Sequence, residues 1–162
     1  MIEHPEAVTI ARQMAETLVG KRISSAMRGN TPHKWAFYSR PAEEYAASLE
    51  GQSITGAEPS GSLILVRVSS GHILVLGGGG ERILYHAEAD TVPQKHQLLL
   101  HFADDTFLSV KVQGWGSCRL YTPEELEGYW WYAKRSLEAT DEGFTREYFR
   151  DLVRDAEARR RP

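Results

Sequence analysis

The first part of the chain carries an apolar pattern with a helical period. Hydrophobic residues recur there at intervals of three and four, at Ala7, Ile10, Ala11, Met14 and Leu18. Such spacing places them on one face of a helix. Pro5 suits a first helical turn, where its missing N–H is not needed, and Gly20 is a natural end. The pattern therefore predicts a helix over residues 5–19 with one face in the core.

After this helix the apolar period changes to that of short strands. The pattern predicts strands over residues 23–27, 53–56, 63–68, 72–76, 97–102 and 107–112. Small and polar residues at 69–71 and 103–106 supply turns between successive strands. We expect a loop with aromatic residues over 28–42 and a short helix over 41–49. Several short strands with turns indicate a β-sandwich or barrel, so the predicted fold class is α+β, a β-sandwich with the N-terminal helix packed along it.

The last part of the chain returns to a helical pattern. We expect a short helix over 123–128 and a longer one over 144–161, whose apolar face is formed by Phe144, Tyr148, Phe149, Leu152, Val153 and Ala156. The chain is thus divided into a sandwich domain over 1–128 and a helical segment over 129–162. The aromatic run 129–132 either packs against the sandwich, which we favour, or forms a homodimer interface together with the last helix.

Composition and charge restrict the possible functions. The chain is 41% hydrophobic and 25% charged, as in an ordinary globular domain, and its net charge of −3 gives no overall basic field. A nucleic-acid surface would therefore be a local patch. The single cysteine, Cys118, excludes an internal disulfide and a multi-cysteine zinc site, and it suggests a reducing, cytoplasmic location. We expect no cofactor, no metal and no membrane span, because no apolar run approaches about 18 residues.

Candidate chemistry lies at the N-terminus and at a run of glycines. Glu3, His4 and Glu6 stand around Pro5, before the apolar face of the first helix. Two carboxylates in this position can move protons to and from a reacting group. Gly77-Gly78-Gly79-Gly80 forms either a flexible hairpin or bulge, or a backbone segment that approaches a ligand closely. No Lys-Ser/Thr pair follows the glycines, which excludes a nucleotide-binding P-loop.

Five segments resemble one known family. Residues 2–10, Ile-Glu-His-Pro-Glu-Ala-Val-Thr-Ile, and 18–23, Leu-Val-Gly-Lys-Arg-Ile, are similar to the start of the formamidopyrimidine-DNA glycosylase and endonuclease VIII family. That family begins Pro-Glu-Leu-Pro-Glu-Val-Glu after its methionine and later shows Leu-Val-Gly-Lys. Residues 93–98, Pro-Gln-Lys-His-Gln-Leu, are similar to its Lys-His-Asp-His segment, and 113–116, Gln-Gly-Trp-Gly, to its Arg-Arg-Phe-Gly. Residues 144–149 resemble the opening of its helix–two-turn–helix module.

The resemblance implies a protein that recognises damaged double-stranded DNA. In the family a base is flipped out of the duplex, the N-terminal amine attacks the sugar, and the base leaves through a Schiff base. Carried over by position, Glu3 falls on the catalytic glutamate, Glu6 on a second glutamate and Ile2 on the proline nucleophile. The implied DNA contacts are Gln113, Trp115, Gly78, Gly79, Lys95 and His96, with Trp115 on the wedge phenylalanine.

Three departures from the family pattern shape the functional expectation. Ile2 replaces the nucleophilic proline, and with Met1 retained its nitrogen is an amide. Gly61 stands near the position of a lysine that touches phosphate. The single cysteine leaves no zinc finger within these residues. We therefore expect a DNA-repair glycosylase fold that excises a base without a dependable lyase step. The alternatives are a non-catalytic lesion binder and a dimeric interaction protein.

Overall fold

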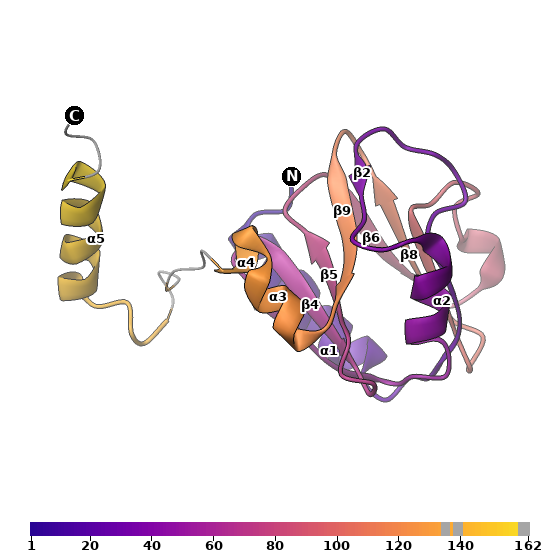
Figure 1. Ribbon diagram of the computed structural model, residues 1–162. Coiled ribbons are helices and arrows are strands. Elements are labelled where there is room, and N and C mark those ends of the chain that lie inside the picture. The colour runs from indigo at the N-terminus through magenta and orange to yellow at the C-terminus, as the bar shows by residue number, and fades with distance from the viewer. Residues whose placement is uncertain (134–136, 138–140, 159–162) are drawn as a thin grey trace.

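The computed structural model describes residues 1–133, 137 and 141–158, and its main body is a two-layered β-sandwich (Figure 1). One sheet has the strand order β1 (Ile23–Met27), β7 (Leu98–Phe102), β8 (Phe107–Val112), β6 (Glu81–His86). The other has the order β2 (Ala36–Phe37), β9 (Gly116–Tyr121), β5 (Ile73–Gly77), β4 (Leu63–Val68), β3 (Ile54–Ser60). All neighbouring strands are antiparallel except β2 and β9, which are parallel.

The helices are α1 (His4–Leu18), α2 (Ala42–Leu49), α3 (Pro123–Gly128), α4 (Trp130–Ala133) and α5 (Arg146–Ala158), with a 3₁₀ turn at η1 (Ala89–Thr91). The apolar stripe of α1 enters the core between the sheets together with Ile64 and Val66 of β4. Tyr45 and Leu49 of α2 enter the same core, and the Tyr45 hydroxyl donates to the carbonyl of Cys118 at 2.5 Å. The predicted fold class, an α+β sandwich with a helix packed along it, is confirmed.

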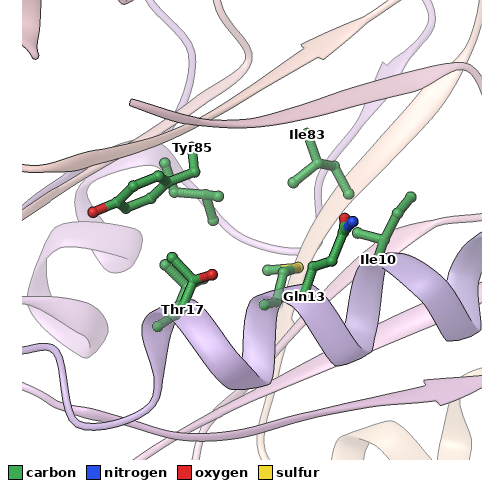
Figure 2. Close-up of a pocket in the computed structure, with 8 residues that line it drawn as sticks. Ile10, Gln13, Thr17, Ile83 and Tyr85 are labelled. Carbon is green, nitrogen blue, oxygen red and sulfur yellow. The ribbon is translucent and has the colours of Figure 1, made fainter. Parts of the chain in front are cut away.

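A narrow cleft lies between α1 and the four-stranded sheet. Figure 2 shows Ile10, Gln13 and Thr17 of α1 on one side and Ile83 and Tyr85 of β6 on the other. Its volume is about 100 Å³. This is below the range of about 300–1,000 Å³ usual for a small-molecule site, so we treat the cleft as a packing feature.

A second apolar cluster covers the outer face of the five-stranded sheet. Its buried members are Leu63, Leu65, Ile73, Val75, Leu126 and Tyr129. Trp131 and Tyr132 of α4 pack against this cluster, whereas Trp130 is exposed. Packing against the sandwich therefore accounts for three of the four aromatic residues at 129–132. The division of the chain at residue 128 stays a prediction.

Sequence patterning missed three strands. β6 begins with a charged residue, β9 is rich in small and polar residues, and β2 has two residues inside the predicted loop 28–42. β3 runs four residues beyond the predicted 53–56, through Gly56 and Pro59. Both residues weaken a strand pattern, yet proline is tolerated here because β3 is an edge strand.

The last helix stands apart from the sandwich (Figure 1). α5 begins at Arg146, two residues after the predicted start at 144, and the predicted end at 161 lies outside the described residues. Its side chains Phe149, Leu152 and Val153 are exposed. The predicted homodimer through this helix stays a prediction. Within the described part of the chain, no helix has the length and apolar character to cross a membrane.

Candidate nucleic-acid interface at the N-terminal end of the sandwich

Strand register brings most of the predicted site segments to one end of the sandwich. Cα pairing joins Glu81 to Val112, Leu98 to Val110, Leu76 to Cys118, Leu63 to Gly77 and Met27 to Leu99. The loops 28–38, 60–62, 77–80, 93–97 and 112–116 therefore share this end. We call these loops and residues 1–3 the N-terminal end, and we call the segments 18–22, 50–53, 69–72 and 103–106 the opposite end.

Ile2 is fixed in place at the N-terminal end. Its backbone N–H donates to the carbonyl of Gly79 at 2.7 Å. Its side chain is only 6% exposed and belongs to the main core. With Met1 in place, the nitrogen at position 2 is an amide, and its N–H already has an acceptor.

Glu3 and Glu6 are both exposed and together form a capping box at the start of α1. The Glu6 carboxylate accepts the backbone N–H of Glu3 at 2.9 Å, and the Glu3 carbonyl accepts the N–H of Ala7 at 2.9 Å. Glu6 thus stabilises the start of α1, as the third residue of a capping box does. The Glu3 side chain is exposed and belongs to the same capping box, in which it faces the backbone N–H of Glu6. The predicted role of Glu3 in catalysis stays a prediction.

The glycine run is packed against the loop of residues 112–116. The Gly80 N–H donates to the Trp115 carbonyl, and the Gln113 N–H donates to the Gly80 carbonyl, both at 2.7 Å. A Cβ added to Gly80 would lie 2.0 Å from the Gln113 carbonyl oxygen, and one added to Gly79 would lie 2.5 Å from that of Trp115. Glycine is required here because two backbones touch. Gly78 and Gly79 are buried, so the structure does not support a flexible hairpin.

Glu81 is a candidate residue that the sequence analysis missed. Its carboxylate is buried and accepts the N–H of Ser117 at 2.6 Å and that of Gly79 at 2.9 Å. Burial raises the pKa of Glu81, and the two amide hydrogen bonds and the nearby N-terminal ammonium oppose that rise. The glutamate that directly follows four glycines was the sequence signal that could have indicated this contact between the glycine run and β9.

Trp115 and Gln113 are exposed on the same loop. Trp115 is 40% exposed, and its ring centroid lies 6.1 Å from that of Trp131. The Trp131 ring also lies directly beside Gly78. The structure therefore places Trp115 next to the glycine run, with part of its ring accessible to a ligand.

Lys95 and His96 lie in the loop just before β7, and their side chains differ in exposure. Lys95 is exposed, whereas His96 is buried. The His96 N–H donates to the Asn30 side-chain oxygen at 3.1 Å, and its ring Nδ1 lies 3.1 Å from the carbonyl of Pro93. A direct DNA contact is thus accessible to Lys95, while His96 ties the 93–97 loop to the 28–38 loop.

Comparison with known proteins identifies a family whose sequences are similar to this chain. The sequence profile of the formamidopyrimidine-DNA glycosylase N-terminal domain matches residues 1–114. A formamidopyrimidine-DNA glycosylase of Lactococcus lactis subsp. cremoris is 26% identical over 168 residues, which cover 100% of this chain and 59% of that protein. Another, from Exiguobacterium sp., is 29% identical over 135 residues, covering 78% of this chain and 45% of that protein. The chain thus spans about half the length of these relatives.

Solved structures share the fold. The Lactococcus lactis glycosylase, non-covalently bound to DNA that contains an AP site, superposes with a TM-score of 0.77 at 24% identity. That match covers 94% of this chain and 58% of the other. MutM in complex with DNA containing carbocyclic 8-oxo-G gives a TM-score of 0.77 at 22% identity, over 94% of this chain and 57% of the other.

Proposed function

Because this chain belongs to the formamidopyrimidine-DNA glycosylase N-terminal domain family, we propose that its N-terminal end binds damaged double-stranded DNA and that Glu3 promotes removal of the damaged base by hydrolysis. The proposal rests on one observation above all. The exposed Glu3 carboxylate stands beside Ile2, whose nitrogen is held by Gly79, on the same surface as Trp115. A carboxylate is exposed there, and the nitrogen of Ile2 is an amide as long as Met1 precedes it.

The DNA-binding part of the proposal is supported by exposure and charge. Trp115 presents a partly exposed aromatic ring that can stack where a base has left the duplex. Lys95 is an exposed cation on the neighbouring loop. The segments 91–103 and 113–123 contain no aspartate or glutamate, so these loops have no carboxylate to repel a phosphate backbone. Both solved relatives described above hold damaged DNA, and we extend that ligand class to this chain.

The chemical part of the proposal is a hydrolysis in which Glu3 acts as a general base. A water molecule attacks the sugar C1′, and the bond between C1′ and the base nitrogen breaks with its electron pair going to the base. Glu3 accepts a proton from the water, and the departing base nitrogen takes up one proton. The products are a free base and an abasic sugar that carries a hydroxyl at C1′. No Schiff base forms, so the strand remains uncut.

Base release from a lesion duplex tests this proposal. The substrates are duplexes with a single 8-oxoguanine or a single formamidopyrimidine, and abasic product is revealed by alkaline cleavage. We expect Glu3→Gln to lower the release rate by about 10²–10⁴-fold, the usual effect of losing a general base. Glu16→Gln is the matched control, because Glu16 is an exposed glutamate on the same helix, three turns away.

Three outcomes separate the parts of the proposal. Release that Glu3→Gln leaves unchanged contradicts the role of Glu3. Lesion-duplex binding without release by the wild type leaves the non-catalytic binder as the function. A borohydride-trapped protein–DNA adduct would contradict the hydrolytic route, because only an imine to a protein amine is trapped in this way.

A further inference from the structure

The loop of residues 28–38 encloses a hollow that the proposed function does not use. Its volume is about 330 Å³, and its lining residues are Arg28, Gly29, Asn30, Thr31, Pro32, His33 and Tyr38. The hollow is more than three times as large as the cleft beside α1, at about 330 Å³ against about 100 Å³. It falls within the range of about 300–1,000 Å³ that accommodates small ligands.

Arg28 is held in this hollow with unused hydrogen-bonding capacity. Its guanidinium carbon lies 4.4 Å from the ring centroid of Tyr38, and its Nη1 donates to the Arg40 carbonyl at 2.6 Å. Its Nε is buried and has no hydrogen-bond partner. Among the described residues, no carboxylate forms an ion pair with Arg28. A guanidinium that is held against an aromatic ring and lines an open hollow is suited to an oxyanion such as a phosphate.

The chain around this loop has a local charge excess that the overall net charge hides. The loop of residues 28–38 contains two cations, Arg28 and Lys34, and no aspartate or glutamate. Lys34 lies above the ring of Trp35, with its Nζ 5.0 Å from the centroid. The 28–38 loop therefore carries a local positive charge on a chain of net charge −3, which favours an anionic partner.

Two exposed aromatic side chains belong to the same loop as the hollow. Trp35 is 52% exposed and Phe37 is 40% exposed. Neither belongs to the buried core, so packing does not account for them. Aromatic side chains beside cations are the usual means of binding unpaired bases, which stack on the rings while the cations contact the backbone.

Backbone pairing joins this loop to the proposed DNA-binding site. β2 runs parallel to β9, with Ala36 paired to Gly116, and the Gly116 N–H donates to the Trp35 carbonyl at 2.9 Å. Trp115 is the residue directly before Gly116. A DNA strand that meets Trp115 can therefore continue onto the 28–38 loop.

We propose that the 28–38 loop binds one unpaired nucleotide of a DNA strand, with its phosphate at Arg28 in the hollow and its base against Trp35. This inference rests on the proposed function and narrows its substrate class. It favours DNA that carries unpaired nucleotides beside the lesion over lesions in fully paired duplex.

A pair of labelled duplexes tests the inference by fluorescence anisotropy. One is fully paired apart from a central abasic analogue, and the other has three additional unpaired nucleotides beside the analogue. We expect the wild type to bind the unpaired substrate more tightly. Trp35→Ala should reduce that preference by at least about fivefold, the lower end of the effect of losing one stacked base, and Trp35→Phe should retain most of it.

The control and the second variant guard against loss of structure. Tyr85→Ala removes an aromatic residue of β6 that is 41% exposed and faces α1, away from the 28–38 loop, and it should leave the preference unchanged. Arg28→Lys keeps the charge but loses the planar donor array, and it should reduce the preference without altering the circular dichroism spectrum. If the wild type binds neither duplex, the proposed function fails. If it binds the paired duplex and Trp35→Ala has the wild-type preference, only this inference is overturned.

Discussion

The two ends of the sandwich are formed by the same strands but differ in how their loops are held. At the opposite end, Lys21 bonds to Asp104 and also donates to the Thr106 hydroxyl at 3.2 Å, in an exposed polar cluster. At the N-terminal end, glycine backbones touch the 112–116 loop and a carboxylate is buried. Polar turns are sufficient to connect strands, as the opposite end demonstrates. The N-terminal end is therefore packed more tightly than turns between strands require, and the proposed function would use that packing to hold Trp115 in a fixed position.

The largest effect should come from a side chain at Gly80. In Gly80→Ala the new Cβ would lie 2.0 Å from the Gln113 carbonyl oxygen, so the two loops must separate. We expect a loss of about 3 kcal/mol in the free energy of unfolding, near the upper end for overpacking, measured by urea denaturation. Gly56→Ala is the control, because its Cβ would meet nothing within 4 Å. Equal effects at the two positions would show that the N-terminal end is not the more tightly packed one.

Glu81→Gln should have the next largest effect. A glutamine has only one side-chain oxygen, so it can accept the backbone N–H of either Gly79 or Ser117. Its NH₂ group then faces the remaining N–H, and this unpaired donor costs about 1–3 kcal/mol of stability. Because burial raises the pKa of Glu81 above its ordinary 4.5, the folded wild type binds a proton more readily than the unfolded chain. Wild-type stability therefore falls as pH rises from 4.5 through the raised value.

The corresponding pH series distinguishes this account from simple loss of packing. The destabilisation by Glu81→Gln should be larger near pH 4.5 than above the raised pKa of Glu81. Denaturation curves recorded across this pH range measure the difference. A destabilisation that is constant with pH would contradict the burial of an ionisable group at this joint.

A smaller effect is expected from Lys95→Ala, seen in DNA binding rather than in stability. Losing one phosphate contact should lower the slope of log affinity against log salt by about 0.9 for duplex DNA. Lys21→Ala removes a cation from the opposite end and should leave the slope unchanged. Salt titrations of abasic-duplex binding provide the comparison, and a matching decrease for Lys21→Ala would place DNA at both ends.

The smallest effect should come from Asp104→Asn at the opposite end. Hydrogen bonding to Lys21 and then to Thr106 lowers the pKa of Asp104 from 3.8 to about 2. The resulting stabilisation is present above 3.8 and is lost as pH falls towards about 2, which is opposite in direction to Glu81. We expect a slight destabilisation near neutral pH that disappears in acid, measured by thermal unfolding. Persistence of the difference in acid would contradict the ion pair as its cause.

The sequence predicts much of the fold because periodicity reports burial directly. The stripe of α1 and the run Leu63-Ile64-Leu65-Val66 follow simple apolar patterns, and the structure buries them. β9 was missed because its burial comes from neighbouring strands rather than from its own composition. β3 was cut short by Gly56 and Pro59, which an edge strand tolerates.

The candidate site was predictable only where a family pattern marked it. Ile2, Glu3, Gln113 and Trp115 were identified by position, and register brings them to one end of the sandwich. Glu81 depends on a tertiary arrangement, since its partners Gly79 and Ser117 lie on different segments. The hollow at Arg28 depends on the path of the 28–38 loop, which carries no regular pattern. Such features cannot be read from residue types alone.

The central claim is that DNA meets the N-terminal end of the sandwich. Backbone amide chemical shifts of the ¹⁵N-labelled full chain, recorded while an abasic-site duplex is added, test it most directly. We predict that shifts concentrate at Gly77–Gly80 and at Gln113–Gly116, while Ala103–Thr106 at the opposite end remains unchanged. Shifts that centre on Ala103–Thr106, or the absence of any shift at saturating duplex, would contradict the claim.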